Sequence, residues 1–360
     1  MKAPSFLRVE RRPTPSGWTV FLVSVLAIAA ALAVAAGLFQ AYGVSPLRAY
    51  QLILQGALGS PLGLAEIVRR AIPLLLCGVG LTVAFRAVFW NIGAEGQLLL
   101  GAVAATGVGL FSGLPDALLL PAMFLAGFLA GAAWGLIPAT LKAKLGLNDV
   151  ITTLMMNYVA AFLVEWLIHG PWKGTQMRGF AYTDKLPDAA RLALIPGTRI
   201  HWLTLVLGLA CALLAYILVT RTRVGFEIRV VGENPHAARF AGMSQVKTTL
   251  LVMLISGGLA GLAGVGEIAG VHGMLRSSSQ ISMGYGYTAI IVAWLARRNP
   301  LAVIVTSLFF GVIMAGGDVI KSSLGLPSQL INVFNGLILF VLIGSEILMN
   351  YRVSLARRRR

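Results

Sequence analysis

The chain has few charged residues and very few cysteines. Only 12% of its 360 residues are Asp, Glu, Lys or Arg, while 58% are hydrophobic and the mean hydropathy is +0.83. Soluble globular proteins carry about a quarter charged residues, so the composition excludes an ordinary soluble enzyme, and the low charge excludes a disordered chain. Cys77 and Cys211 each lie within an apolar run, which excludes a disulfide framework and a paired-cysteine metal site.

Recognisable catalytic machinery is also absent from the sequence. It contains no G-x-x-x-x-G-K-[ST] loop for ATP phosphates, no H-E-x-x-H metal motif and no G-x-S-x-G nucleophile motif. The four histidines, His169, His201, His236 and His272, do not cluster along the chain. We therefore expect no enzymatic activity, no metal and no cofactor in this chain, and a membrane enzyme is the least favoured functional class.

Long apolar runs are what the sequence has in abundance. Runs of about 20 residues are long enough to cross a bilayer as helices, so the sequence predicts an all-α polytopic membrane protein with about ten spans. They lie near 18–40, 64–85, 92–112, 117–141, 150–169, 201–220, 248–271, 283–296, 301–320 and 328–349. The eighth run is short, and the Gly- and Ser-rich stretch Val271–Gly286 is expected to be broken or re-entrant, within protein or a watery cavity.

The basic residues predict the orientation of the chain. There are 29 Lys and Arg against 13 Asp and Glu, and the basic residues lie mostly in short gaps between apolar runs. In a membrane protein this pattern is a topology signal rather than a nucleic-acid patch. With the N-terminus in the cytoplasm, 19 of the 29 basic residues fall in cytoplasmic segments and 10 outside. We therefore expect both termini to be cytoplasmic and no nucleic acid as a partner.

The chain reads as a single transmembrane domain over residues 18–350. A basic cytoplasmic segment, 1–17, precedes it and a basic cytoplasmic tail, 351–360, follows it. The first apolar run exceeds the roughly 7–15 residues of a signal-peptide core, so a retained helix is favoured and cleavage is the alternative. Two connections are long: the extracytoplasmic loop 170–200 and the cytoplasmic loop 221–247.

The cytoplasmic loop carries the pattern of a short helix over residues 235–242. Asn234 can cap a helix by accepting a backbone N–H, and Pro235 suits the first helical position. Gly242 can end the helix in a left-handed conformation. Three apolar side chains share one face: Ala237, Phe240 and Ala241. Because so short a helix is marginal alone, we expect it to dock in a protein groove, with a lipid surface as the alternative.

Several stretches resemble a known family of transport proteins. Residues Asn91–Gln97 read NIGAEGQ and are followed by Gly101, Leu147–Tyr158 read LNDVITTLMMNY, and Gly286–Gly311 contain GYTAI, RNP and FG. These stretches are similar to ABC importer permeases for simple sugars, nucleosides and branched-chain amino acids. The pattern His236-Ala237-Ala238-x-x-x-Gly242 resembles the E-A-A-x-x-x-G coupling-helix motif, with His236 in place of Glu.

This resemblance covers roughly residues 64–349 and is strongest to the longer permease of basic-membrane-protein-type nucleoside importers. It implies a permease subunit for nucleosides first and simple sugars second, in the bacterial inner membrane. It also implies a separate ABC ATPase that holds ATP and Mg, a second and shorter permease, an extracytoplasmic substrate-binding lipoprotein and membrane lipid as partners. The ATPase would contact the residues Asn234, Pro235, His236, Ala237, Ala238, Arg239, Phe240 and Gly242.

An ion-coupled secondary transporter of a small polar solute is the alternative from another class. Such transporters also have many spans and discontinuous helices, and the lack of a phosphate-binding loop in this chain fits them equally well.

Polar residues within or beside the predicted spans are candidates for the substrate path or for gating: Asn91, Glu95, Gln97, Asn157, Glu267, Tyr285 and Tyr287. Ionisable groups at membrane depth usually face a cavity or a partner, which favours Glu267. Asn91 is expected to cap the third helix, with Glu95 in its first turn, where the helix dipole favours a carboxylate and cytoplasmic water can reach it. The alternative is that these residues only start a helix and bond its neighbours.

Overall fold

The computed structural model describes residues 7–11, 17–175, 179–325 and 351–355, together with Val333, Gly336, Leu337, Phe340, Val341 and Gly344. Most of the predicted last span, 328–349, and parts of the terminal segments 1–17 and 351–360 lie outside the described residues. The described chain is mainly helical, as the sequence predicted. The exceptions are two short strands, β1 (Leu7–Arg11) and β2 (Tyr351–Leu355), which pair antiparallel with Leu7 opposite Leu355.

Two compact units make up the chain. One contains Met1–Gly63 and Ile313–Arg360, and the other contains Leu64–Val312. In the first, α1 (Gly17–Ala41) is followed by α2 (Pro46–Ile53) and a π-helical turn, η1 (Leu54–Leu58). The chain bends by 117° between α1 and α2. The bend brings the rings of Phe39 and Tyr50 into edge-to-face contact, with their centroids 5.8 Å apart.

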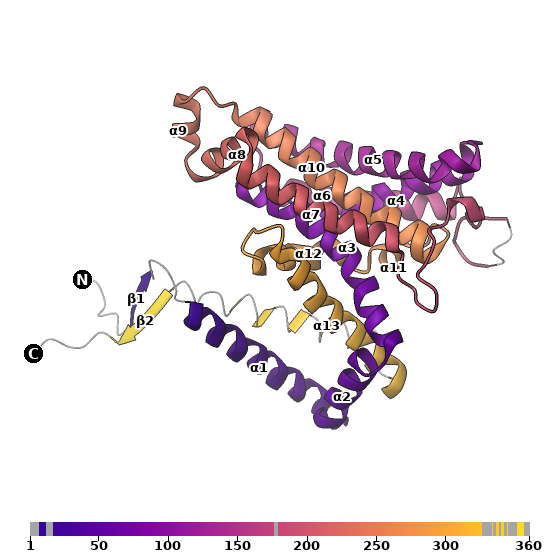
Figure 1. Ribbon diagram of the computed structural model, residues 1–360, viewed down its shortest axis with the longest axis horizontal. Helices are drawn as coiled ribbons and strands as arrows, with labels where there is room; N and C mark the ends of the chain where they lie inside the picture. Colours follow the sequence, from indigo (N-terminus) through magenta and orange to yellow (C-terminus); the bar gives the residue numbers. More distant parts are fainter. Residues whose placement is uncertain are drawn as a thin grey trace, which may run out of the picture. The chain divides into compact units, whose positions relative to one another are not determined.

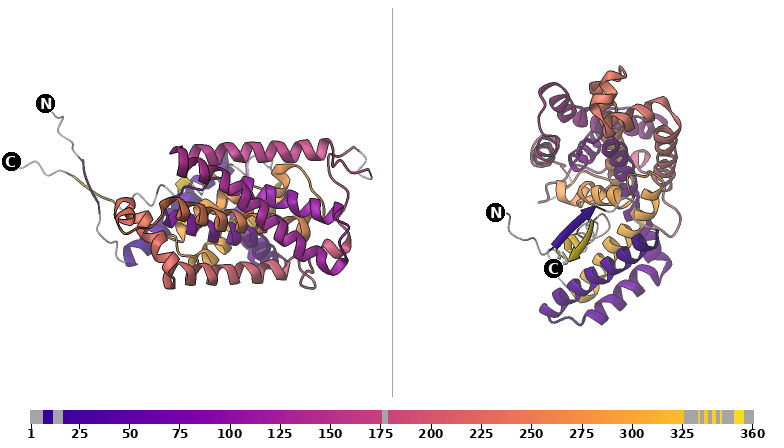
Figure 2. Two further views of the ribbon diagram at one scale, coloured as in Figure 1. Left: turned by 90° about the horizontal axis from the view of Figure 1, so that it is seen from above. Right: turned by 90° about the vertical axis from the view of Figure 1, so that its left-hand side faces the viewer.

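The second unit is a bundle of long helices with short helices between them, and Figure 2 shows the long ones running roughly along one direction. In chain order (Figure 1) its elements are α3 (Pro61–Arg86), α4 (Ala94–Phe111), α5 (Asp116–Leu145), α6 (Asp149–His169), η2 (Asp188–Ala190), α7 (Trp202–Arg221), α8 (Arg223–Glu233), α9 (Pro235–Phe240), α10 (Gln245–Gly266), the π-helical turn η3 (Glu267–His272), α11 (Ser278–Ser282), α12 (Tyr285–Leu295) and α13 (Ala302–Leu324). Helices α3 and α13 begin or end in the first unit.

Fewer membrane-crossing helices are present among the described residues than the sequence predicted. Seven are long and apolar enough, namely α3, α4, α5, α6, α7, α10 with η3, and α13, or eight if the bent α1–α2 pair is counted. The predicted span 283–296 is wrong. Its helix, α12, has 11 residues and is about 16 Å long at 1.5 Å per residue, roughly half of the hydrocarbon core.

The predicted break between Val271 and Gly286 is confirmed. Helix α10 loosens into η3, the chain turns at Gly273 with φ +65°, and two short helices follow. Irregular backbone of this kind survives at membrane depth only where protein or water surrounds it.

Backbone-to-backbone contact joins α4, α5 and α10. A Cβ added to Gly101 of α4 would lie 2.2 Å from the carbonyl oxygen of Gly261 in α10, and one added to Gly131 of α5 would lie 2.3 Å from that of Gly257. No side chain fits at such distances. Membrane helices associate through small residues of this kind because lipid supplies no hydrophobic force between them. These three helices therefore pack against one another at backbone distance.

The connections between spans gather at two ends of this unit. At one end, Arg86 Nε donates to the carbonyl of Arg298 at 2.9 Å, and Gly232 packs on the carbonyl of Arg86. Helices α8 and α9 project from this end (Figure 1). Sequence analysis predicted all these segments for one face of the membrane, and the structure brings them together.

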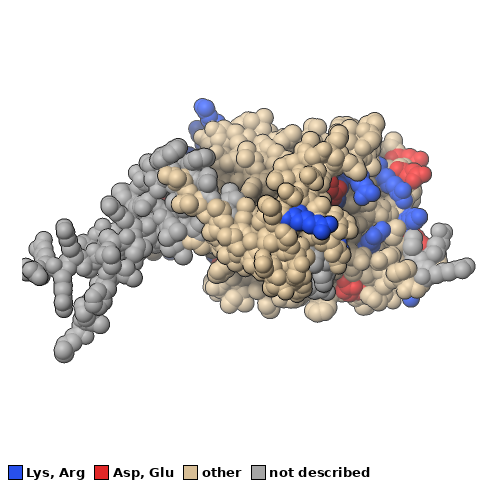
Figure 3. Space-filling view, turned by 90° about the horizontal axis from the view of Figure 1, so that it is seen from below, with Lys and Arg blue, Asp and Glu red and all other residues tan. Residues whose placement is uncertain are grey.

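The opposite end is covered by the loop between α6 and α7. Backbone N–H groups of Thr183, Leu186 and Leu192 donate to carbonyls of Leu275, Gly273 and Ala269, at 3.1, 2.8 and 2.9 Å. The loop also carries exposed charged residues, among them Lys185, Asp188 and Arg191. Figure 3 shows charged side chains gathered at that end of the molecule. The loop thus lies directly over the broken part of the α10–α12 segment.

Replacing Gly101 by Ala is expected to destabilise the bundle, because the new methyl group would meet backbone atoms that have no room to move. Overpacking of this kind costs about 1–3 kcal/mol. The measurement is the thermal midpoint of the purified protein in detergent. Gly37→Ala is the matched control, since no atom lies within 4 Å of its added Cβ. Equal midpoints for the two variants would contradict the close packing.

Candidate functional site

The short helix α9 has the caps that the sequence predicted. Asn234 Oδ1 accepts a hydrogen bond from the N–H of Ala237 at 3.0 Å, and Pro235 occupies the first turn. Gly242 has φ +75°, and the next N–H, of Met243, returns to the carbonyl of Ala238 at 2.9 Å. The helix proper, Pro235–Phe240, is two residues shorter than predicted. Its ends are therefore set by local chemistry.

Most of α9 faces away from the rest of the described chain. Ala238 is buried, whereas the predicted docking face of Ala237, Phe240 and Ala241 is exposed, and Phe240 is 94% exposed. The expected groove is therefore not supplied by the described part of this chain. An apolar ring held out by a capped helix is free to contact another molecule.

Helix α8 connects α9 to the end of α3. Thr222 caps α8 by accepting from the N–H of Gly225 at 3.0 Å, and Arg229 bonds back to the carbonyl of Val219 in α7. At its other end, a Cβ on Gly232 would lie 1.9 Å from the carbonyl oxygen of Arg86. Because α8 and α3 touch through their backbones here, a displacement of α9 that moves α8 also moves the end of α3.

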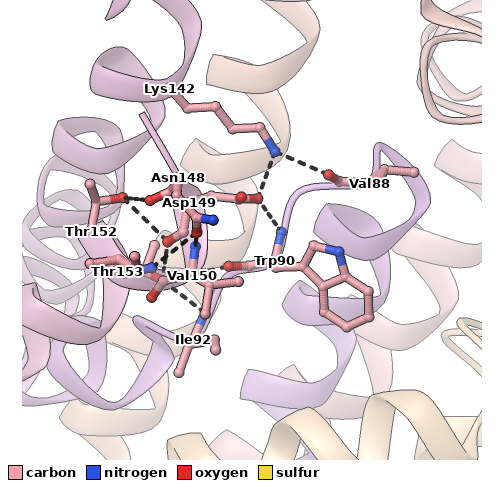
Figure 4. A network of polar contacts seen from close by, with 10 residues as sticks. Val88, Trp90, Ile92, Lys142, Asn148, Asp149, Val150, Thr152 and Thr153 are labelled. Carbon is pink, nitrogen blue, oxygen red and sulfur yellow. Dashed lines mark hydrogen bonds and ion pairs between the residues drawn. The ribbon is translucent and has the colours of Figure 1, made fainter. Parts of the chain in front are cut away.

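A partly buried polar network around the Lys142–Asp149 ion pair holds the turn between α3 and α4 (Figure 4). Asp149 Oδ2 accepts from Lys142 Nζ at 2.6 Å and from the N–H of Trp90 at 2.7 Å. Lys142 also donates to the carbonyl of Val88 at 3.1 Å, and Thr153 accepts from the N–H of Ile92 at 3.2 Å. Sequence analysis did not single out Lys142 or Asp149 as site residues, although Asp149 lies in the LNDVITTLMMNY stretch.

Asn91 does not cap α4, contrary to the sequence expectation. The cap position belongs to Gly93, and Asn91 Oδ1 accepts from the N–H of Gly93 at 3.0 Å. Asn91 Nδ2 donates to Gln97 Oε1 and to Ser256 Oγ, both at 2.9 Å. Because both amides are buried and bonded within the protein, they join α4 to α10 in this conformation.

Glu95 lies in the first turn of α4, as predicted, but it is not open to water. It is 6% exposed, because α12 begins directly on it. Its Oε2 accepts from the N–H of Gly286 at 2.8 Å, with further hydrogen bonds to Ser282 and to the backbone of Tyr287. A carboxylate at this place satisfies N–H groups that the start of a helix leaves without partners.

Helix α6 holds the same broken segment from its other side. Asn157 Oδ1 accepts from the N–H of Gly96 at 2.8 Å, and its Nδ2 donates to the hydroxyl of Tyr287 at 3.2 Å. Glu165 Oε1 accepts from the N–H and the hydroxyl of Ser278 at 2.8 and 3.0 Å. The structure therefore brings the predicted residues Glu95, Asn157 and Tyr287 together at the start of α12.

The remaining predicted residues, Glu267 and Tyr285, belong to a second polar cluster. Arg70 Nη1 donates to the hydroxyl of Tyr285 at 3.2 Å, and Glu66 pairs with both Arg69 and Arg70. Arg69 and Arg70 lie in the predicted second span, 64–85, and both are buried within α3. Glu267 is 1% exposed and interacts electrostatically with both arginines. The buried side chains of Arg69 and Arg70 are tolerated because the carboxylates of Glu66 and Glu267 compensate their charge.

Comparison with known proteins places these features in a family context. The model of the family described as branched-chain amino acid transport system / permease component matches residues 63–343. A glucose ABC transporter permease protein of Haloferax volcanii is 40% identical, with 98% of this chain and 95% of the relative covered.

Two further relatives are permeases for nucleosides. A nucleoside ABC transporter permease protein of Lactococcus lactis is 32% identical, with 89% of each chain covered. A guanosine ABC transporter permease protein of Bacillus subtilis is also 32% identical, with 90% of this chain and 93% of the relative covered. The chain is therefore similar over nearly its whole length to permeases named for two substrate classes.

Substituting Glu95 by Ala is expected to lower the stability of the permease, because the buried N–H of Gly286 loses its acceptor. Leaving a buried donor unsatisfied costs about 1–3 kcal/mol. Glu95→Gln keeps one acceptor oxygen, so its stability is expected to fall between that of the wild type and that of Glu95→Ala. The thermal midpoint in detergent measures the effect, with the exposed Glu233→Ala as control. A midpoint for Glu95→Ala equal to that of the control would show that Glu95 does not hold α12.

Proposed function

This chain belongs to the family of branched-chain amino acid transport system / permease components, and we propose that its substrates are solutes that carry a sugar ring. It is a membrane permease component of an ABC importer, and permeases of this family are not themselves enzymes. The residues alone ranked nucleosides before simple sugars. A glucose permease at 40% identity beside nucleoside permeases at 32% supports giving the two classes equal rank.

Family membership implies an ATPase partner and a second permease. In our proposal the ATPase subunit holds ATP and Mg, the second permease is a different and shorter chain, and an extracytoplasmic lipoprotein delivers the substrate. The complex would lie in a bacterial inner membrane with both termini of this chain in the cytoplasm. The ion-coupled alternative is not retained, because members of this family are subunits of ATP-driven importers.

The observation that carries the proposed mechanism is the exposed, doubly capped helix α9. In this proposal the ATPase grips Phe240 and its neighbours, and closure of the ATPase on ATP displaces α9. The contact between Gly232 and the carbonyl of Arg86 would pass this displacement to α3. Because α3 carries Arg69 and Arg70, the displacement would reach the polar cluster around Glu267.

The buried polar residues divide into two roles in this proposal. Glu95, Asn157 and Tyr287 hold the start of α12, with Asn91 and Gln97 beside them, and act as gating residues whose hydrogen bonds must rearrange when the path opens. Glu267 and Tyr285 line the path at the level of η3. This division follows from the contacts, since the first group is hydrogen-bonded within the protein whereas both carboxylate oxygens of Glu267 lack a hydrogen-bond partner, and Tyr285 bonds Arg70 beside Glu267.

Phe240→Ala is expected to lower both uptake and substrate-stimulated ATP hydrolysis of the assembled importer by about tenfold, as loss of a central aromatic anchor does in other interfaces. Ala237→Trp, which adds bulk to the same face, is expected to have the same effect. Phe162→Ala is the control, because Phe162 is 72% exposed but lies on α6. Coupling that survives both substitutions on α9 would refute the docking role.

A further inference from the structure

Buried polar atoms without a hydrogen-bond partner are concentrated in one place. Among the described residues there are six such side-chain atoms, and five of them belong to Glu267, His201, His272 and Arg276. Both carboxylate oxygens of Glu267 are included. Native proteins satisfy most buried polar groups, so each exception needs an explanation. Five exceptions around a single turn indicate a site that takes its partners from a ligand.

Glu267 and His272 belong to the π-helical turn η3, His201 lies against this turn and Arg276 follows it in the chain. Glu267 Oε2 and His272 Nε2 are 3.7 Å apart, too far for a hydrogen bond. The ring of His201 lies against the same turn, since a Cβ on Gly270 would be 2.7 Å from its Cδ2. Arg276 interacts electrostatically with His272. Single π turns inside helices frequently mark functional sites, and this turn carries a carboxylate beside the imidazole of His272, with the ring of His201 against its backbone.

The charges near Glu267 restrict the chemistry of the ligand. Arg69 and Arg70 act on Glu267, and Arg276 acts on His272, whereas Glu66 is committed to Arg69 and Arg70. A free cation is disfavoured by three guanidinium groups, and an anion is repelled by the carboxylate of Glu267. A neutral ligand with several hydroxyl groups fits best, because each hydroxyl both donates to the carboxylate and accepts from Arg276 or an imidazole.

The loop between α6 and α7 closes this cluster in the present structure. Its N–H groups at Leu186 and Leu192 bond to the carbonyls of Gly273 and Ala269, and Arg191 lies 3.4 Å from the Cβ position of Gly273. Entry from this end requires these few backbone hydrogen bonds to break. A site that is buried when closed strengthens polar contacts to its ligand, because water does not compete for them.

We propose that Glu267 accepts hydrogen bonds from two neighbouring hydroxyls of a sugar ring, with His272 and Arg276 bonding the oxygens of the same hydroxyls. This inference rests on the proposed function and names the part of the substrate that the permease itself selects. The two carboxylate oxygens suit a vicinal diol, which glucose and the ribose of a nucleoside both contain. The base of a nucleoside plays no part in this contact.

The test compares uptake of hydroxylated probes with uptake of probes that lack the hydroxyls. The assembled importer in proteoliposomes is assayed with adenosine, guanosine, glucose, 2′,3′-dideoxyadenosine and 2,4-dideoxyglucose, and the last two compounds have no vicinal diol. We expect Glu267→Gln to raise the KM for the transported hydroxylated probe by about tenfold or more. The variant is also expected to lose most of the wild-type preference for that probe over its deoxy analogue. The wild-type and Glu267→Gln importers receive substrate from the same binding protein, so its selectivity does not contribute to the difference between them.

Asp116→Asn is the matched control, because Asp116 is exposed at the start of α5 and should leave the KM and the preference unchanged. Glu267→Asp keeps the carboxylate and is expected to retain the preference with a raised KM. If the importer does not assemble with Glu267→Gln, the Glu267→Asp variant is the test. A KM for Glu267→Asp equal to that of the wild type overturns the inference.

The outcomes separate the inference from the function on which it rests. A wild-type importer that takes up adenosine, guanosine or glucose, with a Glu267→Gln variant that keeps the same KM and preference, overturns the diol contact and leaves the proposed function intact. A wild-type importer that takes up none of these probes refutes the proposed substrate class and the inference with it.

Discussion

A helix that breaks inside a membrane leaves backbone N–H groups that lipid has no means to satisfy, and this constraint governs the arrangement of the second unit. The break after α10 is stabilised by carboxylates from neighbouring helices: Glu165 of α6 bonds the start of α11, and Glu95 of α4 bonds the start of α12. Both carboxylates accept hydrogen bonds from backbone N–H groups at the start of a short helix, and Glu165 also lies 3.8 Å from His169 Nδ1. The short helices therefore depend on α4 and α6 for their position.

Rigid and adaptable parts of the molecule are separated by the kind of contact they make. Helices α4, α5 and α10 meet through glycines at backbone distance, and such packing permits little relative movement. The segment from η3 to α12 also meets α4 at backbone distance at Gly286, and it is otherwise held by a small number of hydrogen bonds, which can exchange partners. At one end of the unit, α9 reaches α3 through α8. A displacement there would act on these hydrogen bonds while the glycine contacts of α4, α5 and α10 stay intact.

Local features were predicted well from the sequence, because they depend on neighbours along the chain. The caps Asn234 and Gly242, the position of Glu95 in a first turn and the break after Val271 were all confirmed. Features that depend on distant residues were predicted poorly. Asn91 bonds Ser256 rather than capping α4, and Glu95 is shielded from water by α12. Arg69 and Arg70 are buried beside the local carboxylate of Glu66 and the distant residues Tyr285 and Glu267, and the contacts with the distant residues could not be read from the sequence.

The sequence by itself determined that this is a helical membrane protein without its own ATP site and that it resembles importer permeases, because composition, apolar length and short motifs are local properties. Only the tertiary structure decided which polar residues are bonded within the protein and which are not. Asn91, Glu95 and Asn157 are all polar residues near apolar runs, as Glu267 is, and the sequence favoured Glu267 only because it is an ionisable group at the predicted membrane depth. Their roles differ because hydrogen bonding at membrane depth is decided by which helices meet, and the fold leaves the oxygens of Glu267 without a donor.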